Sequence, residues 1–84
     1  MKIKYHRKFI KVFNKLSPKT QKTFYQKLEI FYEDKHDEIL CYHQLHGQLD
    51  NLFSINITGD YRALFQEKNN IVIFMKIGRH CDLY

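Results

Sequence analysis

The spacing of hydrophobic residues in the first third of the chain predicts two helices. Ser17 suits the N-cap of a helix and Pro18 suits its first turn, so a second helix is expected to begin there and to run to about Tyr32. The stripes that define the two helices consist of Phe9, Ile10, Phe13 and Leu16, and of Phe24, Leu28 and Phe31. Because few residues separate the stripes, the helices are expected to form a hairpin.

Beyond a charged loop at Asp34–Glu38 the hydrophobic period changes to two. Phe53, Ile55 and Ile57 alternate with polar residues, which is typical of a strand with one buried face. The other expected strands are Tyr61–Gln66, Ile71–Ile77 and a short one at Lys2–Tyr5, with turns at Gly59-Asp60 and Lys68-Asn69-Asn70. Helices followed by an antiparallel meander indicate an α+β fold, with the helical hairpin packed on a small sheet.

The composition is that of one folded domain that spans residues 1–84. A hydrophobic fraction of 44% with a single proline excludes a disordered chain. Two cysteines, Cys41 and Cys81, are too few for a disulfide scaffold, and no apolar segment typical of a signal peptide follows the first residues. The longest apolar run, Ile71–Met75, is too short to span a membrane. We therefore expect a cytoplasmic protein.

The net charge of +5 is unevenly distributed. Residues 1–35 hold ten Lys/Arg against Glu29, Glu33 and Asp34, whereas residues 36–84 hold four against six acids. Such a cationic half suits a polyanion or an acidic protein partner. A solvated lysine-rich helix surface explains the same pattern about equally well on charge alone.

Polar residues that are able to carry chemistry gather at the predicted strand ends and turns of the second half. A histidine exchanges protons near neutral pH and an arginine presents a planar cation to a phosphate, which together suffice to cleave RNA through its own 2′-hydroxyl. Such a reaction needs no metal or cofactor. The candidate residues are His43, His46, Asn56, Asp60, Arg62, Arg79, His80 and Tyr84.

Several of these histidines and arginines also have ordinary structural explanations. We expect no catalytic role for His6 and His36, and Arg62 is suited to pair with Asp60 or with a backbone carbonyl. Tyr84 is also compatible with a packing role. Zinc is a weaker alternative, because the spacing around Cys41 does not match the paired ligand motifs of structural zinc sites.

The combined motifs resemble the RelE/ParE superfamily of bacterial toxins, and most closely its YafQ-like branch. The resemblance is carried by HQLHGQLDNLFSINITGDYRALFQ and, at the C-terminal end, by IVIFMKIGRHCDLY. It implies an endoribonuclease that cleaves mRNA in the ribosomal A site without a cofactor, and that a cognate antitoxin neutralises. It also implies a fold of order β-α-α-β-β-β.

The resemblance further implies the roles of individual residues. His80 would be the general acid, Asp60 or His43 the general base, and Tyr84 would stack on or orient a nucleotide. Arg62 and Arg79 would stabilise the charge that develops on the phosphate. The residues expected to contact the substrate without reacting are His46, Asn56 and Tyr61.

Two positions depart from the family pattern. Asn56 stands where these toxins often have a second histidine, and Tyr61 stands where they often have tryptophan. An asparagine forms hydrogen bonds but does not transfer protons at neutral pH. The alternative function is therefore a non-catalytic binding protein on the same scaffold, either a gyrase inhibitor of the ParE type or a degenerate regulatory toxin.

Overall fold

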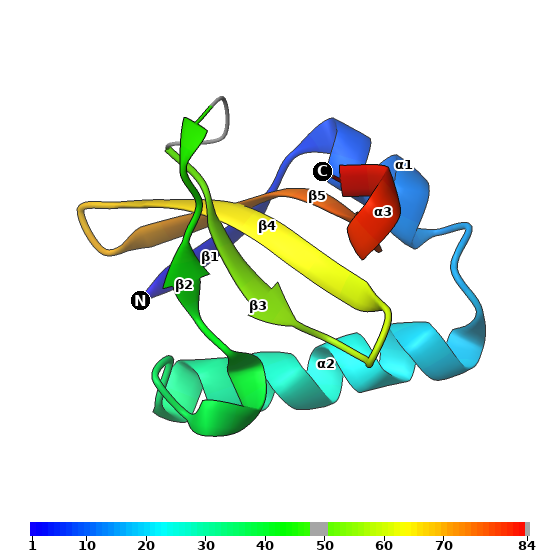
Figure 1. Ribbon diagram of the computed structural model, residues 1–84, viewed down its shortest axis with the longest axis horizontal. Coiled ribbons are helices and arrows are strands. Elements are labelled where there is room, and N and C mark those ends of the chain that lie inside the picture. Colours follow the sequence, from blue (N-terminus) through cyan, green and yellow to red (C-terminus); the bar gives the residue numbers. More distant parts are fainter. Residues whose placement is uncertain (48–50, 84) are drawn as a thin grey trace.

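A computed structural model describes residues 1–47 and 51–83 of the chain, which form helices packed on one sheet. The helices and strands follow in the order shown in Figure 1. They are β1 (Lys2–Tyr5), α1 (Arg7–Phe13), α2 (Pro18–Glu33), the 3₁₀ helix η1 (Glu38–Leu40), β2 (His43–Gln44), β3 (Phe53–Asn56), β4 (Tyr61–Lys68), β5 (Ile71–Arg79) and α3 (His80–Leu83). None of the described helices is long and apolar enough to cross a membrane.

The strands form one five-stranded sheet in the order β1-β5-β4-β3-β2. All neighbouring strands are antiparallel except β1, which lies parallel to β5. The predicted α+β class is thus confirmed, and the predicted strands and helices follow in the expected order. The strand β2 was not predicted, and the sheet is mixed rather than purely antiparallel. The last strand of the β2–β5 meander lies beside the first strand and runs in the same direction.

Local sequence signals fix the start of the second helix of the hairpin, and one side chain closes the connection between the two helices. Ser17 caps α2 by accepting a hydrogen bond from the Thr20 backbone nitrogen at 3.2 Å, and Pro18 occupies the first turn. The first helix ends at Phe13, before the end of its predicted stripe. Gln21 closes the connection, because its side-chain nitrogen donates to the carbonyl oxygens of Phe13 at 2.9 Å and Leu16 at 3.3 Å.

A β-bulge in β5 changes which side chains share a face of the sheet. Phe65 pairs with Phe74 and the preceding Leu64 pairs with Lys76, so Met75 has no opposite residue. Without the bulge, Phe74 and Lys76 would point to the same side, because strand side chains alternate. With it, Lys76 lies on the same side as Leu64. We call that side of the sheet the site side, and the side of Phe65 and Phe74 the helix side.

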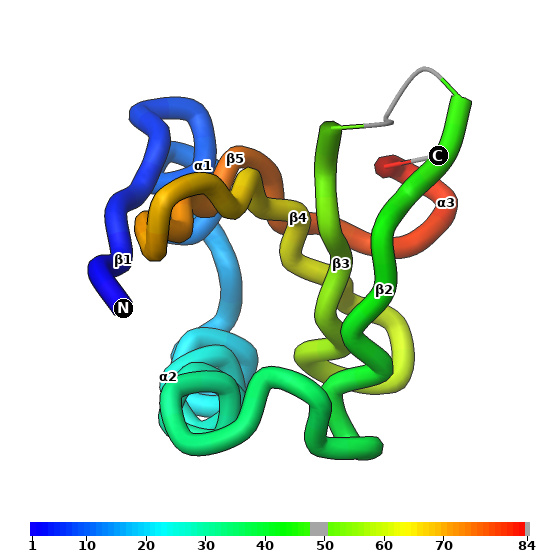
Figure 2. Tube along the Cα trace, turned by 90° about the vertical axis from the view of Figure 1, so that its left-hand side faces the viewer, coloured from blue at the N-terminus to red at the C-terminus, as the bar shows by residue number. Residues whose placement is uncertain are grey.

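The larger hydrophobic core lies on the helix side. Phe74 is fully buried and its ring lies 5.4–5.6 Å from those of Phe9, Phe24 and Phe65. A smaller cluster on the site side consists of Leu45, Leu52 and Leu64, with Met75 and Leu83 packed against it. Figure 2 shows α2 beneath the sheet, with β2, β3 and α3 gathered at the end away from β1 and α1. The sheet thus has an aromatic side and a more polar side.

Candidate functional site

Two rows of residues cross the site side of the sheet. The first row runs over four strands and contains His43, Ser54, Leu64 and Lys76, in which each residue pairs with the next. The second row lies two residues away and contains Asn56, Arg62 and Gly78. Neighbouring strands are about 4.8 Å apart. Three of the predicted site residues, His43, Asn56 and Arg62, therefore share one face of the sheet.

Lys76 belongs to this face and was not predicted as a site residue. It is exposed, although it lies in a strand that is otherwise mostly apolar. A single lysine inside the run Ile71–Ile77 is the signal that points to it, because a lysine is almost never buried without a partner. The alternation alone would have placed it on the helix side, since the sequence gives no sign of the bulge at Met75.

His43 is held in a defined orientation by its own chain segment. Its Nδ1 lies 2.7 Å from the Cys41 carbonyl oxygen. A carbonyl only accepts hydrogen bonds, so Nδ1 carries the proton and donates, which leaves Nε2 as the acceptor in the neutral ring. The carbonyl is brought into place by the left-handed conformation of Cys41, at φ 48° and ψ 46°. His43 thus presents the nitrogen that is able to take up a proton.

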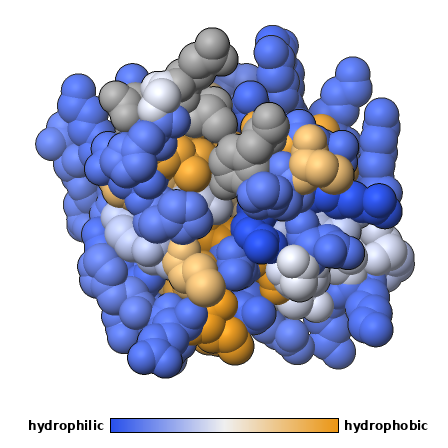
Figure 3. Space-filling view, in the orientation of Figure 1, coloured by the Kyte–Doolittle hydropathy of each residue, from blue (hydrophilic) through white to orange (hydrophobic). Residues whose placement is uncertain are grey.

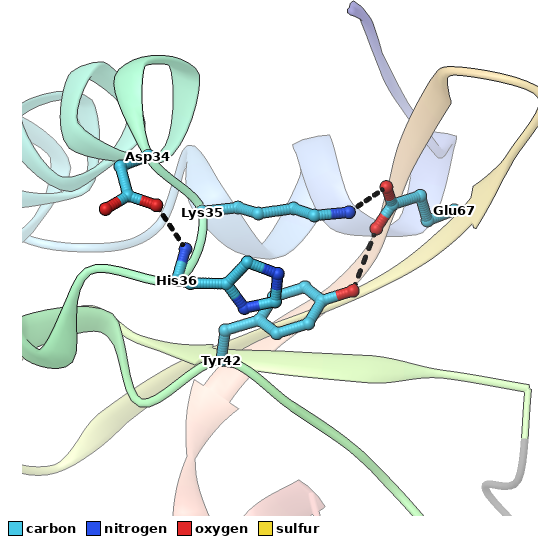
Figure 4. Close-up of polar contacts among 5 residues, drawn as sticks. All are labelled: Asp34, Lys35, His36, Tyr42 and Glu67. Carbon is cyan, nitrogen blue, oxygen red and sulfur yellow. Dashed lines mark hydrogen bonds and ion pairs between the residues drawn. The ribbon is translucent and has the colours of Figure 1, made fainter.

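The residue next to His43 is anchored to β4 by a polar cluster (Figure 4). The Tyr42 hydroxyl donates to one oxygen of Glu67 at 3.0 Å, and Lys35 Nζ lies 2.7 Å from the other oxygen. Burial, followed by the Glu67 carboxylate, raises the pKa of Tyr42. His36 packs edge-on against the Tyr42 ring, with the ring centroids 4.8 Å apart.

Asp60 and His80 meet at the end of the second row. The His80 backbone nitrogen donates to the Asp60 carbonyl oxygen at 3.0 Å, which joins the start of α3 to the turn between β3 and β4. The same turn is tightened by Thr58, whose hydroxyl accepts hydrogen bonds from the Asp60 nitrogen at 3.2 Å and the Tyr61 nitrogen at 3.0 Å. Both Asp60 and His80 are exposed. The backbones of two predicted site residues, far apart in the sequence, therefore meet at this end of the sheet.

Arg62 is held by the turn that precedes it. Its Nη1 donates to the carbonyl oxygens of Thr58 and Gly59 at 3.2 Å and of Tyr61 at 3.3 Å. The alternative that Arg62 bonds to backbone carbonyls is thus confirmed. These hydrogen bonds fix the position of the Arg62 guanidinium group. Carbonyl oxygens do not neutralise its positive charge, so the group still attracts an anion at this end of the sheet.

The C-terminal helix α3 folds over the second row at Gly78. A Cβ atom at this position would lie 3.4 Å from Cδ2 of Leu83, so the glycine permits a close approach of the helix. Leu83 also packs against the leucine cluster of the site side. The helix therefore borders the two rows of the site side. Figure 3 shows a largely hydrophilic surface with hydrophobic residues between the hydrophilic ones.

Arg79 and Tyr61 lie on the other side of the sheet from Arg62. They pair with each other across β4 and β5, and Tyr61 packs against the larger core. A side-chain hydrogen bond in which the guanidinium donates to Tyr61 is the main cause that raises the pKa of Arg79. Arg79 still shares a groove of about 520 Å³ with Lys76, which runs along the end of β5 and is also lined by Lys8 of α1. Three cations and one carboxylate, that of Asp82, thus face this groove.

The two remaining predicted residues, His46 and Tyr84, add little to the geometry of the site. His46 follows β2 and is exposed. Tyr84 lies outside the described residues. Among residues 1–47 and 51–83, no group of three or more His, Cys, Asp or Glu side chains is arranged to hold a metal ion.

Comparisons with known proteins relate the whole chain to one group of toxin structures. No protein-family model matches the chain, and no curated protein matches it. YafQ from Escherichia coli BL21(DE3) superposes with a TM-score of 0.73 at 16% identity, over 98% of this chain and 96% of that one. A YoeB/ParE toxin from Agrobacterium tumefaciens gives a TM-score of 0.77 at 10% identity, over 95% and 99%.

A third related structure contains a second protein. RelE from the archaeon Pyrococcus horikoshii OT3, solved as a complex with RelB, gives a TM-score of 0.72 at 23% identity, over 93% of this chain and 92% of that one. All three superpositions cover nearly the full length of both chains. The chain therefore has the fold that the YafQ, RelE and YoeB/ParE toxins share.

Proposed function

We propose that this protein is a cytoplasmic toxin of the RelE/ParE superfamily that cleaves mRNA in the ribosomal A site. The observation that carries the proposal is that His43, Arg62 and Lys76 lie on one face, the site side, with the backbones of Asp60 and His80 joined at its end. Acid–base groups and cations on one exposed face suit a phosphodiester in a single RNA strand. The shared fold supports the same assignment.

The proposed reaction uses the 2′-hydroxyl of the substrate as nucleophile. A base removes its proton, the oxygen bonds to the adjacent phosphorus, and the bond from phosphorus to the 5′-oxygen breaks as an acid protonates the leaving oxygen. The products are a 2′,3′-cyclic phosphate and a 5′-hydroxyl, so atoms and charges balance. No oxidant, reductant or cofactor enters this reaction.

We assign the acid to His80 and favour Asp60 as the base. The backbone bond between these two residues keeps them at the same end of the face. His43 lies on β2, which is about 14 Å from β5 across the sheet, and its row reaches β5 at Lys76, four residues before His80. His43 is therefore better placed to contact a flanking nucleotide, with Nε2 as its acceptor, although it remains the alternative base.

The cations would stabilise the negative charge of the transition state. Lys76 and Arg62 lie on the same face, in adjacent rows. Lys76 takes the role expected of Arg79, which lies on the other side of the sheet but lines the same groove as Lys76. The groove gives the RNA backbone a cationic path from the site towards α1. Asn56 would hydrogen-bond to the substrate, and His46, Tyr61 and Tyr84 stay predictions for substrate contact or catalysis.

The test is cleavage of a defined mRNA on programmed ribosomes by the purified protein. We expect cuts within the A-site codon that leave a 2′,3′-cyclic phosphate, and no cut when the nucleotide 5′ to the scissile bond carries a 2′-deoxyribose. Intact mRNA from a folded protein would reject the nuclease function. We also propose that a cognate antitoxin binds the chain, as RelB accompanies RelE in the archaeal complex.

A further inference from the structure

The strand that carries His43 is the shortest strand of the sheet. β2 contains two residues and lies at one edge, where it pairs with β3. One further backbone bond, from the Leu45 nitrogen to the Leu52 oxygen at 2.9 Å, extends this pairing. A short edge strand with few backbone hydrogen bonds opens easily. A defined orientation of His43 therefore needs support from outside the strand pairing.

Tyr42 supplies such support from the opposite side of the sheet. Side chains alternate along an extended segment, so Tyr42 points to the helix side, where it packs against the larger core, whereas His43 points to the site side. The Tyr42 ring stacks on Phe53, with centroids 5.4 Å apart, and its centroid lies 6.0 Å from that of Phe65. The chain is thus held to the core one residue before His43.

The hydroxyl group of Tyr42 is held as well as its ring (Figure 4). It donates to Oε1 of Glu67 at 3.0 Å, and Lys35 Nζ lies 2.7 Å from Oε2 of the same carboxylate. The Lys35 and Glu67 side chains are 34% and 22% exposed, so water screens this ion pair less than a pair in open solvent. We call Tyr42, Lys35 and Glu67 the tyrosine anchor. It joins the start of β2 to β4 and to the loop that follows α2.

The anchor lies inside the contact that orients the His43 ring. That contact runs from His43 Nδ1 to the Cys41 carbonyl oxygen at 2.7 Å, so Tyr42 is the residue between its two ends. The contact depends on the left-handed conformation of Cys41, whose φ is 48°. Residues other than glycine rarely adopt this conformation and keep it only where the surrounding structure holds them. A displacement of Tyr42 would therefore release the Cys41 carbonyl and the ring together.

A packing role alone does not account for the anchor. The ring of a phenylalanine would stack on Phe53 as the Tyr42 ring does, so the core does not require the hydroxyl group or its two charged partners. What the hydroxyl adds is a directional bond, which fixes the ring along the strand as well as against the core. Such a bond one residue from His43 restricts the backbone that carries the imidazole.

We propose that Tyr42 is a positioning residue for His43, and that its bond to Glu67, supported by Lys35, keeps the His43 proton on Nδ1 and Nε2 available as an acceptor. The positioning stands by itself, whereas its use by RNA rests on the proposed function. A group that meets Nε2 must then donate a hydrogen bond, as a 2′-hydroxyl or the exocyclic amino group of a base does. A ring protonated at Nε2 would meet the same group with a second donor, and the contact would be lost.

The first test determines the His43 tautomer without RNA. Imidazole ¹⁵N chemical shifts distinguish a proton on Nδ1 from one on Nε2, and they are recorded at pH 8.5, where histidine rings are ordinarily neutral. We expect His43 of the unchanged protein to be protonated at Nδ1. Tyr42→Phe and Glu67→Met should each change the ratio of the two tautomers about fivefold towards Nε2, the factor expected for the loss of one hydrogen bond. The double variant should change it no further, because both substitutions remove the same bond.

Lys27→Met is the matched control. Lys27 also joins a helix to the sheet, through a hydrogen bond from its Nζ to the Ile57 carbonyl oxygen at 3.1 Å, but this bond lies beyond the end of β3 rather than beside β2. The control should leave the tautomer ratio of His43 unchanged. An equal change in the control would indicate general loosening and overturn the positioning role. The role would also fall if His43 of the unchanged protein were protonated at Nε2, or if both anchor variants kept its ratio.

The second test asks whether the orientation of His43 matters to RNA. In steady-state cleavage on programmed ribosomes, Tyr42→Phe should raise KM about fivefold and leave kcat within about twofold, as expected for a lost substrate contact. A lower kcat at constant KM would also support positioning and would make His43 the base. Unchanged kinetics despite a changed tautomer would refute the use of Nε2 by RNA. If the unchanged protein does not cleave, the proposed function fails, and the tautomer ratio still decides the positioning role.

Discussion

The two sides of the sheet are built from different residues and serve different ends. On the helix side, Phe74 lies against the rings of Phe9, Phe24, Phe31 and Phe65, all buried. On the site side a small leucine cluster is bordered by exposed or half-buried polar residues. One side therefore supplies most of the packing energy, which leaves the other side free to carry polar groups that serve the proposed chemistry.

The largest expected effect comes from a substitution on the helix side. Phe74→Ala removes a fully buried ring and should lower the free energy of unfolding by about 3–5 kcal/mol, a large part of the total for a small domain. Denaturant unfolding followed by circular dichroism measures this loss. Lys76→Ala, two residues further along the strand, is the matched control and should change stability by less than about 0.5 kcal/mol. Equal losses would show that both sides carry the fold.

The next largest effect concerns activity. His80→Ala should lower the rate of mRNA cleavage by about 10²-fold or more, because the leaving oxygen loses its proton donor. The thermal midpoint should stay close to that of the unchanged protein, since His80 is exposed. Cleavage rates on programmed ribosomes provide the measurement. A rate within about twofold of the unchanged protein would remove His80 from the reaction.

A smaller loss of stability is expected from the hydrogen bond that joins Tyr42, next to β2, to Glu67 of β4. Tyr42→Phe removes the hydroxyl that donates to Glu67 and should cost about 1 kcal/mol of stability at pH 8. The pKa values of Tyr42 and Lys35 are higher in the folded protein than in the unfolded chain. Their contribution to stability is therefore complete below the pKa values of the unfolded chain, and it is lost as the pH rises through the pKa values of the folded protein.

The corresponding measurement is the thermal midpoint between pH 8 and pH 11. The unchanged protein should lose stability above about pH 10, and Tyr42→Phe should show a flatter decline because one of the titrating groups is absent. Identical pH dependence of the two proteins would show that Tyr42 does not contribute to the alkaline transition.

The smallest effect tests the start of α1. The Nδ1 atom of His6 accepts a hydrogen bond from the Lys8 backbone nitrogen at 3.0 Å and caps the helix. His6→Ala should cost about 0.5–1 kcal/mol, and His6→Asn should restore most of it, because asparagine is a good N-cap. Chemical denaturation at pH 8 measures both variants. A similar loss in both would argue against the cap, and neither should alter cleavage.

Most of the fold was predictable because local signals agreed with the tertiary structure. Ser17-Pro18 marks the start of α2, and the alternation from Phe53 marks β3. The parallel placement of β1 depends on long-range pairing that no local pattern encodes. The helices η1 and α3 were not predicted, since each is at most one turn long and has no periodic stripe.

The candidate site was predictable in its residue types but not in its layout. His43, Asn56 and Arg62 share a face because their strands pair in a particular register. The bulge at Met75 moves Lys76 onto that face and keeps Ile77 in the larger core, and the apolar run gives no sign of it. Arg79 was expected to act together with Arg62, and Tyr61 to contact the substrate, but the register places both residues on the helix side.

The most direct test of this account compares two lysines from the two sides of the sheet. Lys76 lies on the site side, whereas Lys19 is an exposed residue of α2. Single-turnover cleavage of mRNA is measured at saturating ribosome concentration for Lys76→Ala, Lys19→Ala and the unchanged protein. If the site side is catalytic, Lys76→Ala should lose at least about tenfold in rate and Lys19→Ala should change little. Equal rates for all three folded proteins would contradict a catalytic site side and favour a non-catalytic binding protein on this scaffold.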